Sequence, residues 1–158
     1  MYSPALTDFV FMVQDSSYMF VTGPDVVKTV TNEEVTKEEL GGAKMHSSKS
    51  GVSHRAFVND IEAIASTREM MKFLPQSSDG KRADREWTKN DEAAQSSCKV
   101  LNNIIPFDPN KPYDARIIID SVLDRNHFFE IMPDYAKNIL TGFGEVEGKV
   151  VGVVANQP

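Results

Sequence analysis

This chain of 158 residues has one cysteine, Cys98, so it cannot form an internal disulfide, and a reducing compartment is the default expectation. It lacks any run near the roughly 18 consecutive apolar residues of a membrane-spanning helix, which argues against a membrane protein. No basic region precedes an apolar run at the N-terminus, so no secretory signal is predicted. Positive charge is not in excess either. Seventeen basic and 23 acidic side chains give a net charge of −6, which argues against nucleic-acid or anionic-membrane binding.

The chain does have a globular composition, with 41% hydrophobic and 25% charged residues. Two short apolar runs, at residues 9–13 and 18–22, are rich in β-forming side chains and predict strands. Gly23 and Pro24 then predict a helix start, because proline suits the first helical position. The first part of the chain therefore combines strands and helices.

Two capping boxes predict further helices. Thr36 with Glu39 predicts a short helix that the glycine pair at residues 41–42 ends. Asn59 with Glu62 predicts a longer helix over residues 60–74, with Met70 and Met71 as core filler. The apolar face predicted for that helix consists of Ile61, Ile64, Ala65, Met71 and Leu74.

Residues 76–110 have mixed charge and few large apolar side chains, which predicts a linker or exposed excursion that ends in extended form at the prolines of residues 104–112. Asp114 is the predicted cap of a helix over residues 115–123. The remainder predicts strands at 128–131, 139–146 and 149–155, with Glu147 and Gly148 as a two-residue hairpin turn.

The window from Gly41 to Val58 is unusual because it holds Lys44, Lys49 and Arg55 but no acidic residue. Glycines, hydroxyls and cations are what a phosphorylated ligand requires. A solvated loop whose charges are balanced by the upstream glutamates explains the composition equally well.

Two of the three histidines, His46 and His54, also lie in this window. Their spacing matches no helical metal pair, so hydrogen-bonded structural histidines are favoured over metal ligands. No Gly-x-Ser-x-Gly elbow marks a nucleophile. The pair Gly142 and Gly144 is too short for a dinucleotide fingerprint and lies in a predicted strand.

Six ordered blocks of the chain match one family. They are YSPALTDF (residues 2–9), GPDVVK (23–28), EELGGAK (38–44), SGVSHR (50–55), FFEIMPDYAKNI (128–139) and VANQP (154–158). The chain thereby resembles the acyl-CoA carboxyltransferase family, the carboxyltransferase subunits of biotin-dependent acyl-CoA carboxylases. The first two blocks favour its propionyl-CoA branch over the methylcrotonyl branch. The likeness fails mainly over residues 76–110.

The resemblance implies an α/β fold of the crotonase-like ββα-spiral (ClpP/crotonase) type, with parts of two related domains. Residues 1–75 would end the N-domain, residues 76–110 would link the domains, and residues 111–158 would begin the C-domain. It further implies an acyl-CoA such as propionyl-CoA as substrate and biotin as cofactor, with no metal in this half-reaction. Two pairs of backbone N–H groups would hold the thioester enolate and the biotin ureido oxygen.

In the family those two N–H pairs precede Tyr2 and follow Pro158, so we expect both to lie outside this chain. We therefore expect no carboxylation by this chain alone; turnover in a radiolabelled-bicarbonate assay would refute that. Implied partners are a biotin carboxylase and biotin carrier α subunit and further copies of the β subunit in a homo-oligomer. The implied location is the mitochondrial matrix in a eukaryote and the cytoplasm otherwise.

Two sets of candidate site residues follow from the resemblance and the charge pattern. The first set, for acyl-CoA or biotin, is Gly41, Gly42, Ala43, His46, Ser50, Gly51, His54, Arg55, Asn156 and Gln157. The second set, on the acyl-CoA-binding segment, is Arg125, Phe128, Glu130, Tyr135, Lys137 and Asn138. Three alternatives stay open: an acyl-CoA decarboxylase subunit, a transcarboxylase subunit of the same fold, and a non-catalytic assembly module.

Overall fold

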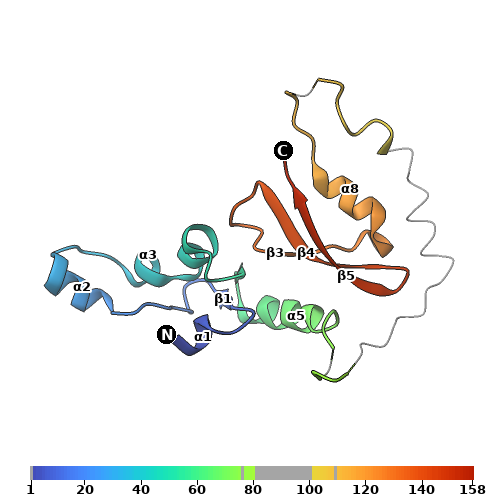
Figure 1. The fold of residues 1–158 in the computed structure, drawn as a ribbon. Helices are drawn as coiled ribbons and strands as arrows, with labels where there is room; N and C mark the ends of the chain where they lie inside the picture. The colour runs from blue at the N-terminus through green and yellow to red at the C-terminus, as the bar shows by residue number, and fades with distance from the viewer. Residues whose placement is uncertain (1, 76, 81–100, 109) are drawn as a thin grey trace. The chain divides into compact units, whose positions relative to one another are not determined.

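A computed structural model of the chain describes residues 2–75, 77–80, 101–108 and 110–158 (Figure 1). These residues divide into two compact units, Met1–Arg68 with Met132–Ala136, and Glu69–Ile131 with Lys137–Pro158. Among the described residues, no helix has the length and apolar character needed to cross a membrane.

The first unit is built around a two-stranded parallel sheet. Strands β1 (Phe11–Val13) and β2 (Arg55–Phe57) pair with Met12 opposite Ala56. Val10, Met12 and Ala43 form a small buried cluster beside this sheet. The helices of the unit are α1 (Tyr2–Ala5), α2 (Pro24–Thr31), α3 (Lys37–Gly41), α4 (Ala43–Met45), the π-helix η1 (His46–Ser50) and α5 (Asp60–Met70), which continues into the second unit.

The start of α3 confirms the predicted capping box, since Thr36 and Glu39 bond each other's backbone N–H groups. The predicted end of α3 at the glycine pair is confirmed, because Gly41 is the last helical residue and Gly42 is the C-cap. The cap is not in the left-handed conformation common for a C-terminal glycine. Gly42 is extended, with φ −77°, and α4 begins at the next residue. Both glycines instead serve close packing, as described below.

The predicted strand at residues 18–22 is wrong. Only Tyr18 forms a bridge, to Gly42, and the Met19 N–H donates to the Gly41 carbonyl oxygen at 2.8 Å. Because the end of a helix offers one or two carbonyl groups and not a ladder, the apolar run has no partner with which to extend.

Helix α5 is shorter than predicted and buries a different face. After Met70 the chain tightens into turns, with the Phe73 N–H bonded to the Met70 carbonyl at 3.0 Å. Ile61 and Ile64 are 80% and 61% exposed, whereas Ser66 and Met70 are buried. The buried face includes Ser66 because its hydroxyl accepts a hydrogen bond from Arg55, so one polar residue lies where periodicity predicts apolar ones. Of the two methionines predicted as core, Met70 is buried and Met71 is 55% exposed.

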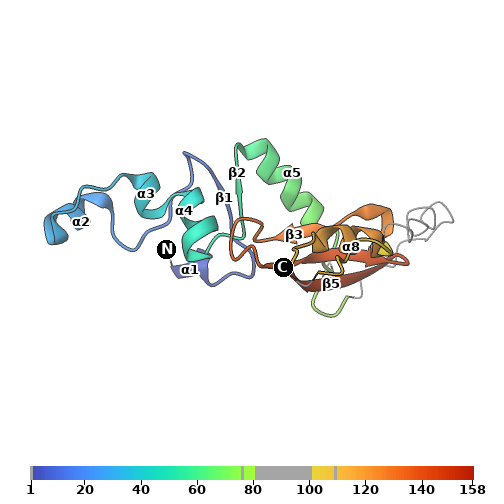
Figure 2. The same ribbon diagram turned by 90° about the horizontal axis from the view of Figure 1, so that it is seen from above.

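The second unit is a three-stranded antiparallel sheet with one helix on it. Strands β3 (Phe129–Ile131), β4 (Ile139–Val146) and β5 (Lys149–Asn156) lie in that order, and α8 (Ala115–Val122) covers one face (Figure 2). A 3₁₀ turn, η2 (Asp124–Asn126), joins α8 to β3. The core between α8 and the sheet consists of Ala115, Ile119, Leu123, Phe128 and Leu140. The predicted helix and all three predicted strands are confirmed here.

The buried carboxylate of Asp124 holds the β4–β5 hairpin turn. Glu147 and Gly148 have φ of 52° and 75°, the signature of the predicted two-residue hairpin turn. The Asp124 carboxylate accepts hydrogen bonds from both backbone N–H groups, at 3.1 and 2.8 Å. On the other face of the sheet, Phe73 stacks on Phe143, with ring centroids 6.0 Å apart.

Most of the predicted linker, residues 76–110, lies outside the described residues. Residues 101–108 are described, and they form turns and bends rather than the predicted extended segment. Pro106 lacks an N–H donor and so cannot contribute to a strand ladder, which accounts for the irregular backbone.

Candidate functional site

Gly41 and Gly42 are positions where a side chain would collide with the fold. A Cβ on Gly41 would lie 2.2 Å from the Met19 carbonyl oxygen, and one on Gly42 would lie 2.2 Å from the Glu38 carboxyl carbon. Ala43 beside them is fully buried in the core. The space next to both glycines is therefore filled by protein atoms.

His46 is a buried structural histidine. Its Nε2 lies 2.5 Å from the Met19 carbonyl oxygen, and its Nδ1 lies 2.7 Å from the Ser50 hydroxyl. Since the carbonyl can only accept, Nε2 carries the proton and Nδ1 accepts from Ser50. The ring thereby ties η1 to the segment after β1, as the hydrogen-bonded interpretation predicted.

Gly51 ends η1 in a left-handed conformation, with φ +69°. The ring of Tyr135 covers it, and a Cβ on Gly51 would lie 3.0 Å from that ring. Tyr135 belongs to residues 132–136, which lie between β3 and β4 in the sequence and are part of the first unit. Two candidate residues from distant parts of the sequence therefore meet here.

His54 bonds the backbone on both sides of it. Its Nδ1 accepts from the Val10 N–H at 3.1 Å, and its carbonyl oxygen accepts from the Met132 N–H at 2.9 Å. Burial lowers the pKa of this imidazole, against a smaller raising effect of the Val10 hydrogen bond. Because Nδ1 accepts from the Val10 N–H, the proton of the neutral ring is on Nε2.

Arg55 is placed by side chains of its own unit. Its guanidinium donates to the Ser66 hydroxyl at 3.2 Å and lies 5.5 Å from the centroid of the Phe57 ring. The stacking and the hydrogen bond together fix the cation beside β2.

A cavity of about 240 Å³ opens between α3 and the α4–η1 segment; we call it the Lys44–Lys49 cavity. It is lined by Glu38, Glu39, Lys44, Met45, Ser48 and Lys49. Hydrogen bonds from Thr36 are the main reason that the pKa of Glu39 is lowered, with a smaller contribution from Lys49. Of the predicted window, the two lysines reach this cavity, and neither histidine lines it.

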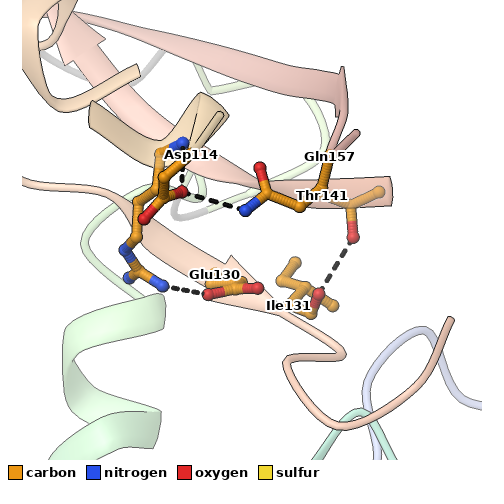
Figure 3. Close-up of polar contacts among 6 residues, drawn as sticks. Asp114, Glu130, Ile131, Thr141 and Gln157 are labelled. Carbon is orange, nitrogen blue, oxygen red and sulfur yellow. Dashed lines mark hydrogen bonds and ion pairs between the residues drawn. The ribbon is translucent and has the colours of Figure 1, made fainter. Parts of the chain in front are cut away.

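Gln157 joins the end of β5 to the start of α8 (Figure 3). Its Oε1 accepts from the Ala115 N–H at 2.8 Å, its Nε2 donates to the Asp114 carboxylate at 2.9 Å, and its own N–H donates to the Asn138 carbonyl at 2.8 Å. Both the oxygen and the nitrogen of the side-chain amide are therefore hydrogen-bonded within the fold. Asn156, the neighbouring candidate, is exposed.

The remaining candidates are in the second unit and differ in exposure. Glu130 forms an ion pair with Arg116 (Figure 3). Phe128 is buried in the core, with its ring centroid 5.6 Å from the Arg116 guanidinium. Arg125 and Lys137 are exposed, and Arg125 has a left-handed backbone with φ 58°. Phe128 and Glu130 thus have places in the fold, while the two cations are accessible to solvent.

Sequence reasoning missed two carboxylates. Asp124 lies in no recognisable motif, and its role in holding the hairpin turn is seen only from its hydrogen bond to the Gly148 N–H. Glu38 lies inside the capping-box block, but its Oε2 atom is buried without a hydrogen-bond partner among the described residues. No sequence signal could have identified either, because both depend on long-range or side-chain geometry.

Comparison with known proteins adds the wider context. A family model, the carboxyl transferase domain, matches residues 1–158. The chain is 53% identical to the mitochondrial propionyl-CoA carboxylase beta chain of Homo sapiens and 53% identical to the propionyl-CoA carboxylase beta chain of Roseobacter denitrificans, over 99% of this chain in both cases. It spans 29% and 30% of the length of those two relatives.

A solved structure of transcarboxylase 12S, described as a hexamer with methylmalonyl-coenzyme A and methylmalonic acid bound, superposes with a TM-score of 0.90 at 39% identity. That match covers 99% of this chain and 30% of the other. A single-chain long-chain acyl-CoA carboxylase superposes with a TM-score of 0.71 at 20% identity, a likeness of fold. The crotonase-like carboxyltransferase fold predicted from the sequence is thereby confirmed.

Proposed function

The chain belongs to the carboxyl transferase domain family, and on that premise we propose that it is part of the carboxyltransferase β subunit of a propionyl-CoA carboxylase. The observation that carries the proposal is 53% identity to propionyl-CoA carboxylase beta chains over 99% of this chain. The proposed reaction moves the carboxyl group of carboxybiotin to the α-carbon of propionyl-CoA and yields methylmalonyl-CoA. Carboxybiotin would supply the carboxyl group and a base for the α-proton, and backbone N–H groups would stabilise the thioester enolate.

The described residues do not form a cradle for biotin at the candidate glycines. The space next to Gly41 and Gly42 is filled by the Met19 carbonyl and the Glu38 carboxylate, and the Gln157 amide is occupied by the start of α8. We therefore propose that these residues take no direct part in the reaction and instead hold the surrounding backbone in place.

For the acyl-CoA, we assign contact with the phosphates to exposed cations of the second unit. Arg125 and Lys137 are exposed, as contact with an anionic ligand requires. Phe128 is buried in the core, and Glu130 is in an ion pair with Arg116. We propose that the buried residues of the acyl-CoA-binding segment maintain its conformation and that the exposed residues contact the ligand.

We further propose the domain assignment and the partners that the family implies. Residues 1–75 belong to the N-domain, 76–110 to the linker and 111–158 to the C-domain. The β subunit forms a homo-oligomer and acts with a biotin carboxylase and biotin carrier α subunit. The location is the mitochondrial matrix in a eukaryote, in keeping with the word mitochondrial in the name of the human relative, and the cytoplasm in a bacterium.

The test is carboxyl transfer and substrate binding by the assembled enzyme that contains this chain. We expect incorporation of labelled bicarbonate into propionyl-CoA, dependent on ATP and on the biotin-bearing subunit. An excess of propionyl-CoA at 100 times its Kd should also stabilise the native state by about 2.7 kcal/mol, which raises Tm. Free CoA is the control for the acyl group. No incorporation and no shift of Tm would contradict the proposal.

A second candidate function is a transcarboxylase subunit, favoured by the superposition on transcarboxylase 12S at a TM-score of 0.90. The carboxyl donor separates the two: a transcarboxylase needs no ATP and accepts the carboxyl group from another carboxylated compound. An acyl-CoA decarboxylase would release carbon dioxide from methylmalonyl-CoA instead. A non-catalytic assembly module would show none of these reactions and would oligomerise.

A further inference from the structure

Helix α5 presents to solvent the aliphatic face that its sequence predicts for the core. Ile61 and Ile64 are 80% and 61% exposed, although large aliphatic side chains are normally buried. The helix cannot rotate to bury them, because its inner side is fixed by the buried Ser66, which accepts a hydrogen bond from Arg55 at 3.2 Å. Ser66 lies about 200° around the helix from Ile64. The aliphatic face of α5 is therefore open to a partner.

One row of residues along that face has a charge of opposite sign at each end. Asp60, Ile64 and Arg68 are spaced four residues apart, so they form one ridge along the helix. Asp60 is in the first turn of α5 and Arg68 is in the last. Both side chains are exposed, and neither forms an ion pair with any residue that the structure describes. The ridge is thus acidic, aliphatic and basic in order, with Ile64 at its midpoint.

This ridge is complementary to itself when a second α5 runs antiparallel to the first. With Ile64 against its own copy, each Asp60 lies opposite Arg68 of the other copy. Ridges of this spacing interlock in the commonest class of helix packing, in which the two axes are about 8–10 Å apart. A parallel pair would instead place like charges side by side, and it would align the two helix dipoles. A partner of α5 must supply the same three features in reverse order, which a second copy of the chain does.

We propose that α5 is a contact between two copies of this chain, in which the two helices pair antiparallel about a two-fold axis at Ile64. The inference rests on the proposed function, because it assumes the homo-oligomer of β subunits and adds the face that one of its interfaces uses. One helix face is smaller than the roughly 800 Å² per partner of a typical stable interface, so the α5 pair is one part of a larger contact.

The first measurement is disulfide formation in the assembled enzyme that contains this chain. A two-fold axis places residue 64 beside its own copy, so Ile64→Cys should form an intermolecular disulfide under mild oxidation, which mass spectrometry identifies. The variant is made with Cys98→Ser, which removes the one cysteine of this chain. The matched control is Val30→Cys on α2, which replaces an aliphatic residue that is 74% exposed in the same unit and should stay reduced. Equal yields from the two variants would indicate chance collisions and overturn the pairing.

Exchange of the two charges tests the ion pairs. Arg68→Asp should weaken self-association about tenfold in analytical ultracentrifugation, because each of the two symmetric contacts then sets two carboxylates against each other. Adding Asp60→Arg to that variant should restore association, since the ridge is again complementary to its own copy. Lys37→Asp on α3 is the control for a change of net charge at an exposed lysine, and circular dichroism checks that each variant is folded. Equal weakening by the control, or no recovery in the double variant, would contradict the pairing.

Alkylation of Ile64→Cys separates the other possible partners of this face. A cysteine that is shielded in the assembled enzyme without forming a disulfide would identify the biotin-bearing subunit or a further segment of a longer chain as the cover, and an accessible cysteine would mean an uncovered face; both outcomes overturn the pairing. Carboxyl transfer is measured separately on the unaltered enzyme. Transfer without the disulfide contradicts the α5 pairing alone, whereas the disulfide without transfer supports the pairing and contradicts the proposed reaction.

Discussion

The ring of Tyr135 covers the backbone of Gly51, at a position where a Cβ on the glycine would stand 3.0 Å from the ring carbons. The two residues are far apart in the sequence, and the contact brings the loop between β3 and β4 onto the end of η1 in the first unit. Gly51 is suited to this place for two reasons: its φ of +69° and the lack of room for a side chain.

Gly51→Ala should destabilise the chain by about 1–2 kcal/mol, because a side chain is strained in this backbone conformation and the Tyr135 ring must move. Urea unfolding measures the loss. Gly152→Ala is the matched control, since a Cβ there meets no atom within 4 Å. Equal stability of the two variants would show that the Tyr135–Gly51 contact is not tight.

Asp124→Asn should destabilise the β4–β5 hairpin by about 2 kcal/mol. The carboxylate accepts from two backbone N–H groups, and an amide oriented to satisfy one would point its NH₂ at the other. Hydrogen exchange of the Glu147 and Gly148 amides should accelerate. The control Glu147→Gln keeps the turn and changes only an exposed charge, so rapid exchange in both variants would contradict the role of Asp124.

His54 should make stability depend on pH. Burial lowers the pKa of its imidazole below the usual 6.5, so the native state prefers the neutral ring. The stabilising contribution is complete above pH 6.5 and is lost as the pH falls toward and through the folded pKa, because the unfolded chain then binds the proton first. His54→Asn keeps an acceptor for the Val10 N–H and removes the titration. Unfolding free energies measured from pH 7.5 to 5 should fall more steeply in the unaltered chain; parallel curves would count against this.

Gln157→Ala should lower stability by about 1–2 kcal/mol, because it removes the side-chain contacts to Asp114 and to the first N–H of α8. The exposed neighbour gives a control, Asn156→Ala, which should leave the unfolding curve unchanged. Ligand binding separates the two roles that sequence reasoning left open for Gln157. A loss of propionyl-CoA affinity without a loss of stability would mean that the amide contacts the substrate after all.

Local sequence signals predicted much of the secondary structure. The capping box at Thr36, the cap at Asp114 and the Glu147–Gly148 turn all act through hydrogen bonds or backbone preferences within a few residues, and all are present. The matched family blocks likewise led to the crotonase-like fold, because ordered blocks along both ends of a chain are highly specific.

The predictions that were wrong concern segments whose structure depends on a contact with a residue distant in the sequence. The run at residues 18–22 has strand character but meets the end of α3, and α5 turns Ser66 inward because Arg55 bonds it. The candidate site residues show the same limit. Nothing local indicates that His46 bonds the Met19 carbonyl or that Gln157 bonds the start of α8.

By itself, the sequence determined the family, the helix starts and the hairpin, since these depend on residue identity and on hydrogen bonds between near neighbours. The tertiary structure alone decided which polar groups are consumed by the fold and which remain available to a ligand. Hydrogen-bond capacity is limited, so an amide or imidazole bonded on every side is structural whatever motif it belongs to.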